Sequence, residues 1–488
     1  MLQTTTNKHA TKWGQFGTLI SVFFFWGFVA ASNDILIPVF KKAFDLTQGE
    51  SQLVSVAFYV AYTVGSLIYF GVSKAIGSDV LNKIGYRNGI ALGLIISALG
   101  TLLFYPAANN ASFTLMISGL FIVGLGFSLQ QIAANPLAIV MGDPATGSQR
   151  LTMAGGVNNF GTTIGPLIVS FAIFGSVSAG STEASIESVK TPYLILGLAF
   201  LLVAIFFKFS SVPNKIDLDE VAHEEAVEGG EKLLHKKSAF QYPQLIMGMI
   251  AIFVYVGVEV STASNLPAYL EERLAIPTEK VAPYISLYWA SLMIGRWAGA
   301  VGAFDVSAGA KKMLSFFMPY LAFAVFLLVN VIANHDITPF YIYAVVIAVM
   351  ILCDIMSKGN PVRMLLIFSA AGIVALCIGM ATSGIVSAYA FTSVGLFCST
   401  LWPCIFTIAV AGLGRHTNQG SSLLIMMIMG GGIVSYLQGV MADQIGIQYS
   451  YIVGVLCFAY LVFYAIRAKA VLKAQGIDFD KLSSGGSH

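Results

Sequence analysis

Long apolar runs, separated by short polar segments, follow one another along almost the whole chain. A helix needs roughly 20 mostly apolar residues to cross the hydrocarbon core of a bilayer, so runs of about 18 or more are candidate spans. Fourteen such runs lie at residues 17–40, 51–76, 88–107, 113–141, 151–175, 191–211, 243–269, 280–304, 313–334, 338–356, 363–381, 385–411, 418–442 and 447–467. The pattern predicts an all-α membrane protein with 14 transmembrane helices.

The positions of the basic residues test this count, because lysine and arginine accumulate in cytoplasmic loops. With the N-terminus inside, 14 spans place 21 of the 26 basic residues on the cytoplasmic side. The five on the other side are Lys41, Lys42, Lys190, Arg273 and Lys280. The bias predicts that both termini, residues 1–15 and 468–488, are cytoplasmic.

A polar stretch at residues 212–242, rich in Asp and Glu, leaves six runs before it and eight after it. We expect a solvated cytoplasmic linker between a bundle at 16–211 and a second bundle at 243–467. Residues 33–40 resemble residues 262–269 at an offset of 229, and Gly65 matches Gly295 at an offset of 230, which indicates repeated bundles. The sequence therefore predicts two six-helix bundles plus an extra helix pair at about 313–356. An inserted pair preserves the sidedness of every later span.

Composition excludes several classes of protein. Hydrophobic residues make up 57% of the chain and charged residues 10%, with a mean hydropathy of +0.80. A soluble enzyme, a nucleic-acid binder and a disordered chain are excluded, because soluble chains carry roughly 25% charged residues. The five cysteines show no CxxC spacing, and the chain has no nucleotide-binding lysine loop, HExxH or GxSxG. We therefore expect neither enzyme activity nor a metal or cofactor, and transport must use a gradient.

Several motifs are specific enough to indicate a family. They are FFWGF (24–28), NDILIP (33–38), AANP (133–136), NNFGTTIGP (158–166), YVGVEVS (255–261), IGRW (294–297), WPCIFT (402–407) and GRHTNQGSS (414–422). Together they resemble the fucose:proton symporter family of the major facilitator superfamily, over about residues 16–304 and 363–467. The resemblance implies a major facilitator fold that carries a hexose or hexose derivative with a cation by alternating access.

Two carboxylates lie inside predicted spans, where a charged group persists only if it faces a cavity or a partner. The first is Asp34, which the resemblance implicates in sugar binding and proton coupling; the alternative is a structural hydrogen bond between helices. Fucose permeases carry a glutamate at the position of Gln131, whereas the glucose/galactose branch resembles this chain in having glutamine, so the resemblance is closer to that branch. An amide releases no proton. Glu259 is then the second candidate for a sugar contact or for coupling. Its alternative is a neutral carboxyl bonded to the backbone.

Amides at membrane depth supply the paired donors and acceptors that a sugar needs. Asn33, Asn135, Asn158 and Asn265 complete the expected binding set with Asp34, Gln131 and Glu259, although each amide alone could simply join helices. Aromatic residues in the spans could stack on a sugar or only pack; they are Trp26, Tyr59, Phe160, Tyr288, Trp289 and Trp402. Family members have a glutamine where this chain has Gly155, which suggests a bulkier or differently hydroxylated substrate.

A degraded cytoplasmic gating motif follows the second span, with Asp79 and Arg87, and Arg296 is its counterpart in the second half. Charge pairs there are expected to hold one closed state. The expected partners are a sugar, a proton with sodium as the alternative ion, and the lipid bilayer, without nucleic acid. We expect a monomer in a bacterial inner membrane. The competing hypotheses are a carrier of another polar solute and a transport-deficient sugar sensor.

Overall fold

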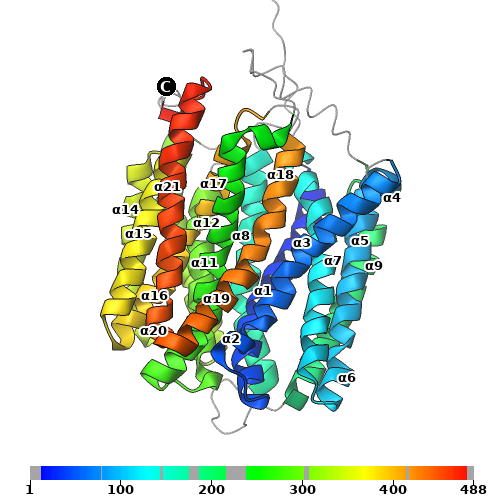
Figure 1. Ribbon diagram of the computed structural model, residues 1–488, viewed down its shortest axis with the longest axis vertical. Helices are drawn as coiled ribbons and strands as arrows, with labels where there is room; N and C mark the ends of the chain where they lie inside the picture. Colours follow the sequence, from blue (N-terminus) through cyan, green and yellow to red (C-terminus); the bar gives the residue numbers. More distant parts are fainter. Residues whose placement is uncertain are drawn as a thin grey trace, which may run out of the picture.

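The computed structural model describes residues 12–77, 80–142, 147–174, 186–215, 238–301, 307–413 and 417–480. Everything regular in these residues is helical (Figure 1). The first half contains α1 (Trp13–Ala43), α2 (Gln48–Ser51), α3 (Leu53–Ala75), α4 (Val80–Ile84), α5 (Tyr86–Leu102), α6 (Phe104–Asn109), α7 (Phe113–Val140), α8 (Gly147–Phe174), the 3₁₀ turn η2 (Ile186–Val189) and α9 (Lys190–Phe209).

The second half begins after the linker, of which residues 216–237 lie outside the described part. It contains η3 (Ala239–Gln241), α11 (Pro243–Leu274), η4 (Thr278–Lys280), α12 (Ala282–Ala300), α13 (Ala308–Ile332), η6 (Thr338–Ile342), α14 (Tyr343–Ser357), α15 (Pro361–Ala381), α16 (Gly384–Cys398), α17 (Leu401–Val410), α18 (Thr417–Met426), η8 (Met427–Met429), α19 (Gly430–Ile445), α20 (Ile447–Ser450) and α21 (Ile452–Ala474).

Thirteen helical segments among the described residues are long and apolar enough to cross a membrane. The fourteenth predicted span corresponds to α12, whose 19 residues are nearly long enough for the hydrocarbon core at 1.5 Å per residue. Most of α12 is buried inside the protein, so its serines and tyrosines need not face lipid. The all-helical membrane fold is confirmed, and the span count agrees closely.

The two halves use the same pairwise packing. In the first half α1 packs on α8, α3 and α5 pack on α7, and α5 packs on α9. In the second half α11 packs on α19, α12 and α15 pack on α16, and α15 packs on α21. The two sets have the same order when α13 and α14 are set aside. The halves meet mainly where α8 packs on α12 and α3 packs on α19.

Two glycines mark equivalent helix crossings. A Cβ on Gly65 of α3 would lie 2.6 Å from the Cβ of Ser128 on α7, so only glycine fits there. Gly295 of α12 lies against Ser399, just after α16, with even less space for a side chain. Small residues of this kind let membrane helices approach closely. The offset between the paired residues is 230 at the glycines and 271 at the serines, because α13 and α14 lie between them.

The same end of both halves is closed. It is the end that carries α2, at the bottom of Figure 1, and we call it the α2 end; the C-terminus marks the opposite end. Residues 31–40 of α1 and 260–270 of α11 are buried without interruption. Burial over more than two consecutive turns means that every side of a helix is covered. The halves therefore meet tightly at the α2 end.

Candidate functional site

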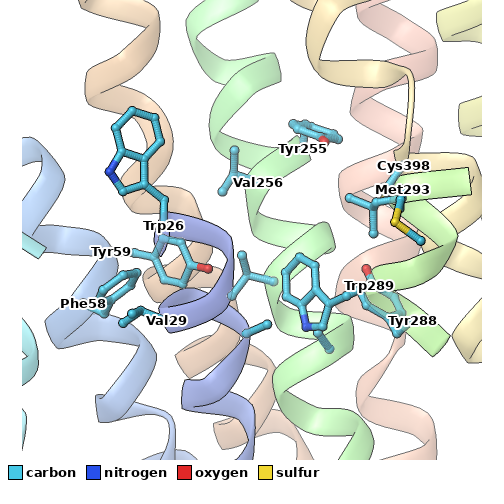
Figure 2. Close-up of a cluster of buried hydrophobic side chains, with 14 of the residues drawn as sticks. Trp26, Val29, Phe58, Tyr59, Tyr255, Val256, Tyr288, Trp289, Met293 and Cys398 are labelled. Carbon is cyan, nitrogen blue, oxygen red and sulfur yellow. The ribbon is translucent and has the colours of Figure 1, made fainter. Parts of the chain in front are cut away.

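Asp34 reaches across the interface between the two halves. It lies on α1, its side chain is 3% exposed, and its Oδ2 accepts a hydrogen bond from Nε1 of Trp289 on α12 at 2.7 Å. Figure 2 shows a cluster of buried hydrophobic side chains, in which Trp289 and Tyr59 point toward one another. Among the described residues no ion pair involves Asp34, and the indole that donates to its carboxyl group is neutral.

The backbone beside Asp34 adds a second polar group. Pro38 lies inside α1, and since proline has no N–H, the carbonyl of Asp34 loses its helical donor four residues later. Both side-chain amide atoms of the neighbouring Asn33 are buried without a hydrogen-bond partner among the described residues. Buried polar groups are normally paired, and unpaired ones call for a ligand or water. This turn of α1 therefore offers a carboxyl and an unsatisfied amide together.

Glu259 lies on α11 of the second half, one turn before the position that the repeat offset pairs with Asp34. Its carboxyl group accepts a hydrogen bond from the hydroxyl of Tyr255, one turn earlier on the same helix. The hydroxyl of Tyr288 donates to the backbone oxygen of Glu259 at 2.7 Å. Tyr288 and Trp289 are consecutive in α12, so this dipeptide contacts the helix of one carboxylate and the side chain of the other.

Three more of the predicted amides lie on α7 and α8. Nε2 of Gln131 lies 3.3 Å from the hydroxyl of Tyr62, and Asn135 follows one turn later, also half-buried. Nδ2 of Asn158 donates to the backbone oxygen of Phe23 on α1 at 2.9 Å, which leaves its own Oδ1 available to a ligand. These three residues belong to the first half, as Asn33 and Asp34 do.

Asn265 lies elsewhere, at the α2 end. Its Oδ1 accepts from Nε2 of Gln48 on α2 at 3.0 Å, and its Nδ2 donates to the backbone oxygen of Ser261 at 2.9 Å. The Gln48 bond joins the two halves. Among the seven residues predicted to bind substrate, Asn265 is the amide whose donor and acceptor atoms both have hydrogen-bond partners within the described residues.

Two ion pairs and one further aspartate connect the two halves at the α2 end. Lys41 lies 3.4 Å from Glu272, and Lys42 lies 2.6 Å from Glu271, so the last turn of α1 pairs with that of α11. Asp443, near the end of α19, accepts from the backbone N–H groups of Gln48 and Gly49 at 2.9 and 2.8 Å. We call these contacts, together with the bond between Gln48 and Asn265, the α2-end latch.

Of the predicted gating residues, Arg296 joins the halves. Its Nη1 donates to Oδ1 of Asn159 on α8 at 2.7 Å, and its Nε lies 3.4 Å from the backbone oxygen of Ser399. It also lies within electrostatic range of Glu259. A Cβ on Gly155 would lie 3.3 Å from its Nη1, so the guanidinium takes part of the space that the missing side chain leaves.

The other gating residues contribute less. Arg87 donates from Nη1 to the backbone oxygen of Ser210 at 2.7 Å, which ties α5 to the end of α9 within the first half. Asp79 lies outside the described residues. Among the described residues no group of three or more His, Cys, Asp or Glu side chains is placed to hold a metal ion.

Two repeated membrane-spanning helical bundles with carboxyl groups near their interface define a membrane solute carrier. The chain belongs to the Major Facilitator Superfamily, whose family model matches residues 16–357. The resemblance seen in the sequence is thereby confirmed.

Comparisons with known proteins extend over nearly the whole chain. The glucose/galactose transporter of Brucella abortus biovar 1 (strain 9-941) is 32% identical over 467 residues, which cover 95% of this chain and 96% of that protein. The L-fucose-proton symporter of Escherichia coli (strain K12) is 29% identical and covers 92% of each chain. A solved structure of the major facilitator transporter FucP in the outward conformation has a TM-score of 0.59 at 26% identity, covering 93% of this chain and 98% of that chain.

Three contributors to the site were not predicted as polar partners. The sequence indicates Trp289 only as an aromatic that could stack or pack, whereas its N–H donates a hydrogen bond to the carboxyl group of Asp34. Tyr255 and Asp443 were not singled out. The signal available for Trp289 and Tyr255 was that a buried indole N–H or phenol hydroxyl needs a partner. Asp443 offered no such signal, because its partners are backbone groups of another bundle.

Proposed function

We propose that the protein takes up a hexose or hexose derivative together with a cation, by alternating access between its two bundles. One observation carries this proposal: the buried Asp34 and the half-buried Glu259 come from opposite bundles near their interface and accept hydrogen bonds from an indole N–H and a phenol hydroxyl. Relatives along nearly the full length are named as glucose/galactose and L-fucose-proton transporters. A carboxyl held by neutral donors suits proton binding, because neither protonation state is locked by a permanent charge.

The proposed sugar contacts come from both bundles. Asn33, Asp34, Gln131, Asn135 and Asn158 contribute from the first, and Glu259 contributes from the second. Asn265 reaches the sugar only after its bond with Gln48 opens. Closure around a ligand that both bundles touch lets its binding energy move one bundle against the other.

The proposed orientation follows the placement of the basic residues. Both termini lie in the cytoplasm of a bacterial cell, the chain works as a monomer in the inner membrane, and the α2 end faces outward. The described arrangement is then closed to the outside, in contrast with the outward conformation of the FucP structure. We assign residues 16–211 and 243–467 to the two bundles, and α13 with α14 to the additional pair, because no helices of the first half correspond to them.

Counterflow in proteoliposomes tests the substrate. Purified protein is loaded with unlabelled glucose, galactose or fucose, and entry of the labelled sugar is followed without any ion gradient. Transient accumulation of one sugar supports the proposal. Failure with every sugar, in protein that remains folded by thermal melting, would favour the carrier of another solute or the sugar sensor.

Substitutions at the two carboxylates test the coupling. Asp34→Asn mimics the protonated form, so it should retain counterflow and lose accumulation driven by an inward proton gradient. Glu259→Gln is the matched variant in the other bundle. If Asp34→Asn accumulates sugar like the natural chain and Glu259→Gln does not, the coupling role belongs to Glu259. If neither substitution changes uptake and sodium alone drives it, sodium is the coupling ion.

A further inference from the structure

We propose that Trp289 is a positioning residue that links the protonation of Asp34 to the arrangement of the two bundles. This inference rests on the proposed function, since it assigns a partner to the proposed coupling carboxyl. The hydrogen bond between them joins α1 of the first bundle to α12 of the second at 2.7 Å. It is therefore a direct contact between a titratable group and the opposing bundle.

The chemistry of the pair makes the bond sensitive to charge. An indole N–H can only donate, so it cannot accept the O–H of a protonated carboxyl and bonds only the acceptor oxygen that remains. A hydrogen bond to an ionised acceptor is roughly twice as strong as one between neutral groups. Both side chains are buried, at 3% and 4% exposed, so water does not replace the bond in this arrangement. Ionised Asp34 therefore binds Trp289 more firmly than protonated Asp34 does.

Other titratable groups surround Asp34 without replacing this donor. Tyr59 faces it from α3 and Tyr288 lies within electrostatic range on α12, as phenols. Glu259 lies across the interface on α11 and acts on the same two tyrosines. On α1 itself Lys41 is two turns away and is engaged with Glu272. Trp289 is thus the group whose bond to the Asp34 carboxylate spans the bundles directly.

The bond matters to the cycle because it exists in an arrangement with the α2 end closed. A contact that is stronger in one protonation state shifts the conformational equilibrium by that difference. Ionised Asp34 should favour the closed α2 end, and protonation should release it for opening. Counterflow between two sugar pools does not require the empty carrier to reopen, whereas net uptake does. Loss of the Trp289 donor should therefore alter net uptake more than counterflow.

The test uses Ser261→Cys as a reporter of opening. Ser261 is fully buried on the face of α11 that carries Asn265, and its hydroxyl has no partner among the described residues, so the substitution is mild. Labelling by a membrane-impermeant thiol reagent is measured at alkaline pH, where the carboxylate form prevails, and corrected for the same chain without the reporter. All variants are compared at the same pH, so thiol reactivity cancels.

Four chains form the cycle: the reporter chain, and the same chain with Trp289→Phe, with Asp34→Asn, or with both. Each single substitution should accelerate labelling several-fold, and the double variant should be no faster than the faster single one, because Asp34→Asn weakens the same bond that Trp289→Phe removes. Trp289→Tyr keeps a donor and should restore slow labelling. Trp26→Phe is the matched control, because Trp26 donates to Gln130 within the first bundle at 2.9 Å.

Unchanged labelling in Trp289→Phe, or effects that multiply in the double variant, would overturn the inference. If Trp289→Phe does not fold, the Trp289→Tyr and Asp34→Asn chains still decide it: Asp34→Asn must accelerate labelling in the natural background. The proposed function fails separately, by the absence of counterflow for every sugar. If the Trp289 variants show normal counterflow but an altered pH dependence of net uptake, that result supports both the inference and the proposed function.

Discussion

Two asparagines of the proposed site differ in how other groups of the protein satisfy their hydrogen bonds. Both amide atoms of Asn33 are buried without partners among the described residues, whereas Asn158 donates to the backbone of Phe23. An unpaired buried polar group costs about 1–3 kcal/mol. The two substitutions to alanine should therefore act in opposite directions on stability, although both remove a proposed sugar contact.

We expect Asn33→Ala to raise the thermal stability of the sugar-free protein and to weaken sugar binding by about 1–3 kcal/mol. Asn158→Ala should weaken binding similarly and lower stability, because it removes a hydrogen bond that joins α8 to α1. Thermal melting and equilibrium binding of the sugar identified by counterflow measure the two effects. Unchanged sugar affinity in both variants would remove these amides from the site.

At the scale of elements, the last turns of α1 and α11 carry opposite charges at corresponding positions of the repeat. Their ion pairs in the α2-end latch are partly exposed, with Lys42 at 52% and Glu271 at 36% side-chain exposure. Exposed pairs contribute only about 0–1 kcal/mol. Because carriers balance two states of similar free energy, even a contribution of this size changes their populations.

Lys42→Glu should therefore increase thiol labelling of Ser261→Cys by no more than about fivefold, the ratio that corresponds to about 1 kcal/mol. Adding Glu271→Lys should restore the slow rate, since the pair is re-formed with its charges exchanged. The matched control is Lys190→Glu, which breaks the pair of Lys190 with Glu187 inside one bundle and should leave labelling unchanged. If the exchanged pair labels as fast as Lys42→Glu, the ion pair does not hold the closed state.

At the scale of the whole molecule, α13 and α14 stand beside the repeated bundles. We expect cysteines placed on these helices to label at the same rate with and without saturating sugar. Cysteine at Asn135 should be protected under the same conditions, because that residue belongs to the proposed site. Sugar protection on α13 or α14 would place the pair within the transport pathway.

The sequence predicted the spans well because length and hydropathy determine them locally. It also predicted Asp34, Glu259 and the amides as candidates, since polar groups inside spans are rare. The donors of Trp289 and Tyr255, and the cap that Asp443 supplies, depend on which helices meet across the interface. A chain with 60 aromatic residues does not indicate locally which of them donate a hydrogen bond to a carboxylate.

The start of α2 has a double arrangement of caps. Thr47 and Glu50 cap it from within its own segment, since the Thr47 side chain accepts from the N–H of Glu50 and the Glu50 side chain accepts from that of Thr47. Asp443, which belongs to the opposite bundle, accepts hydrogen bonds from two further backbone N–H groups of α2. When the bundles part, α2 keeps its own cap and exchanges the two bonds to Asp443 and the bond between Gln48 and Asn265 for bonds to water. The end of the carrier can thus open and reseal as a preformed joint, without refolding a segment in each turnover.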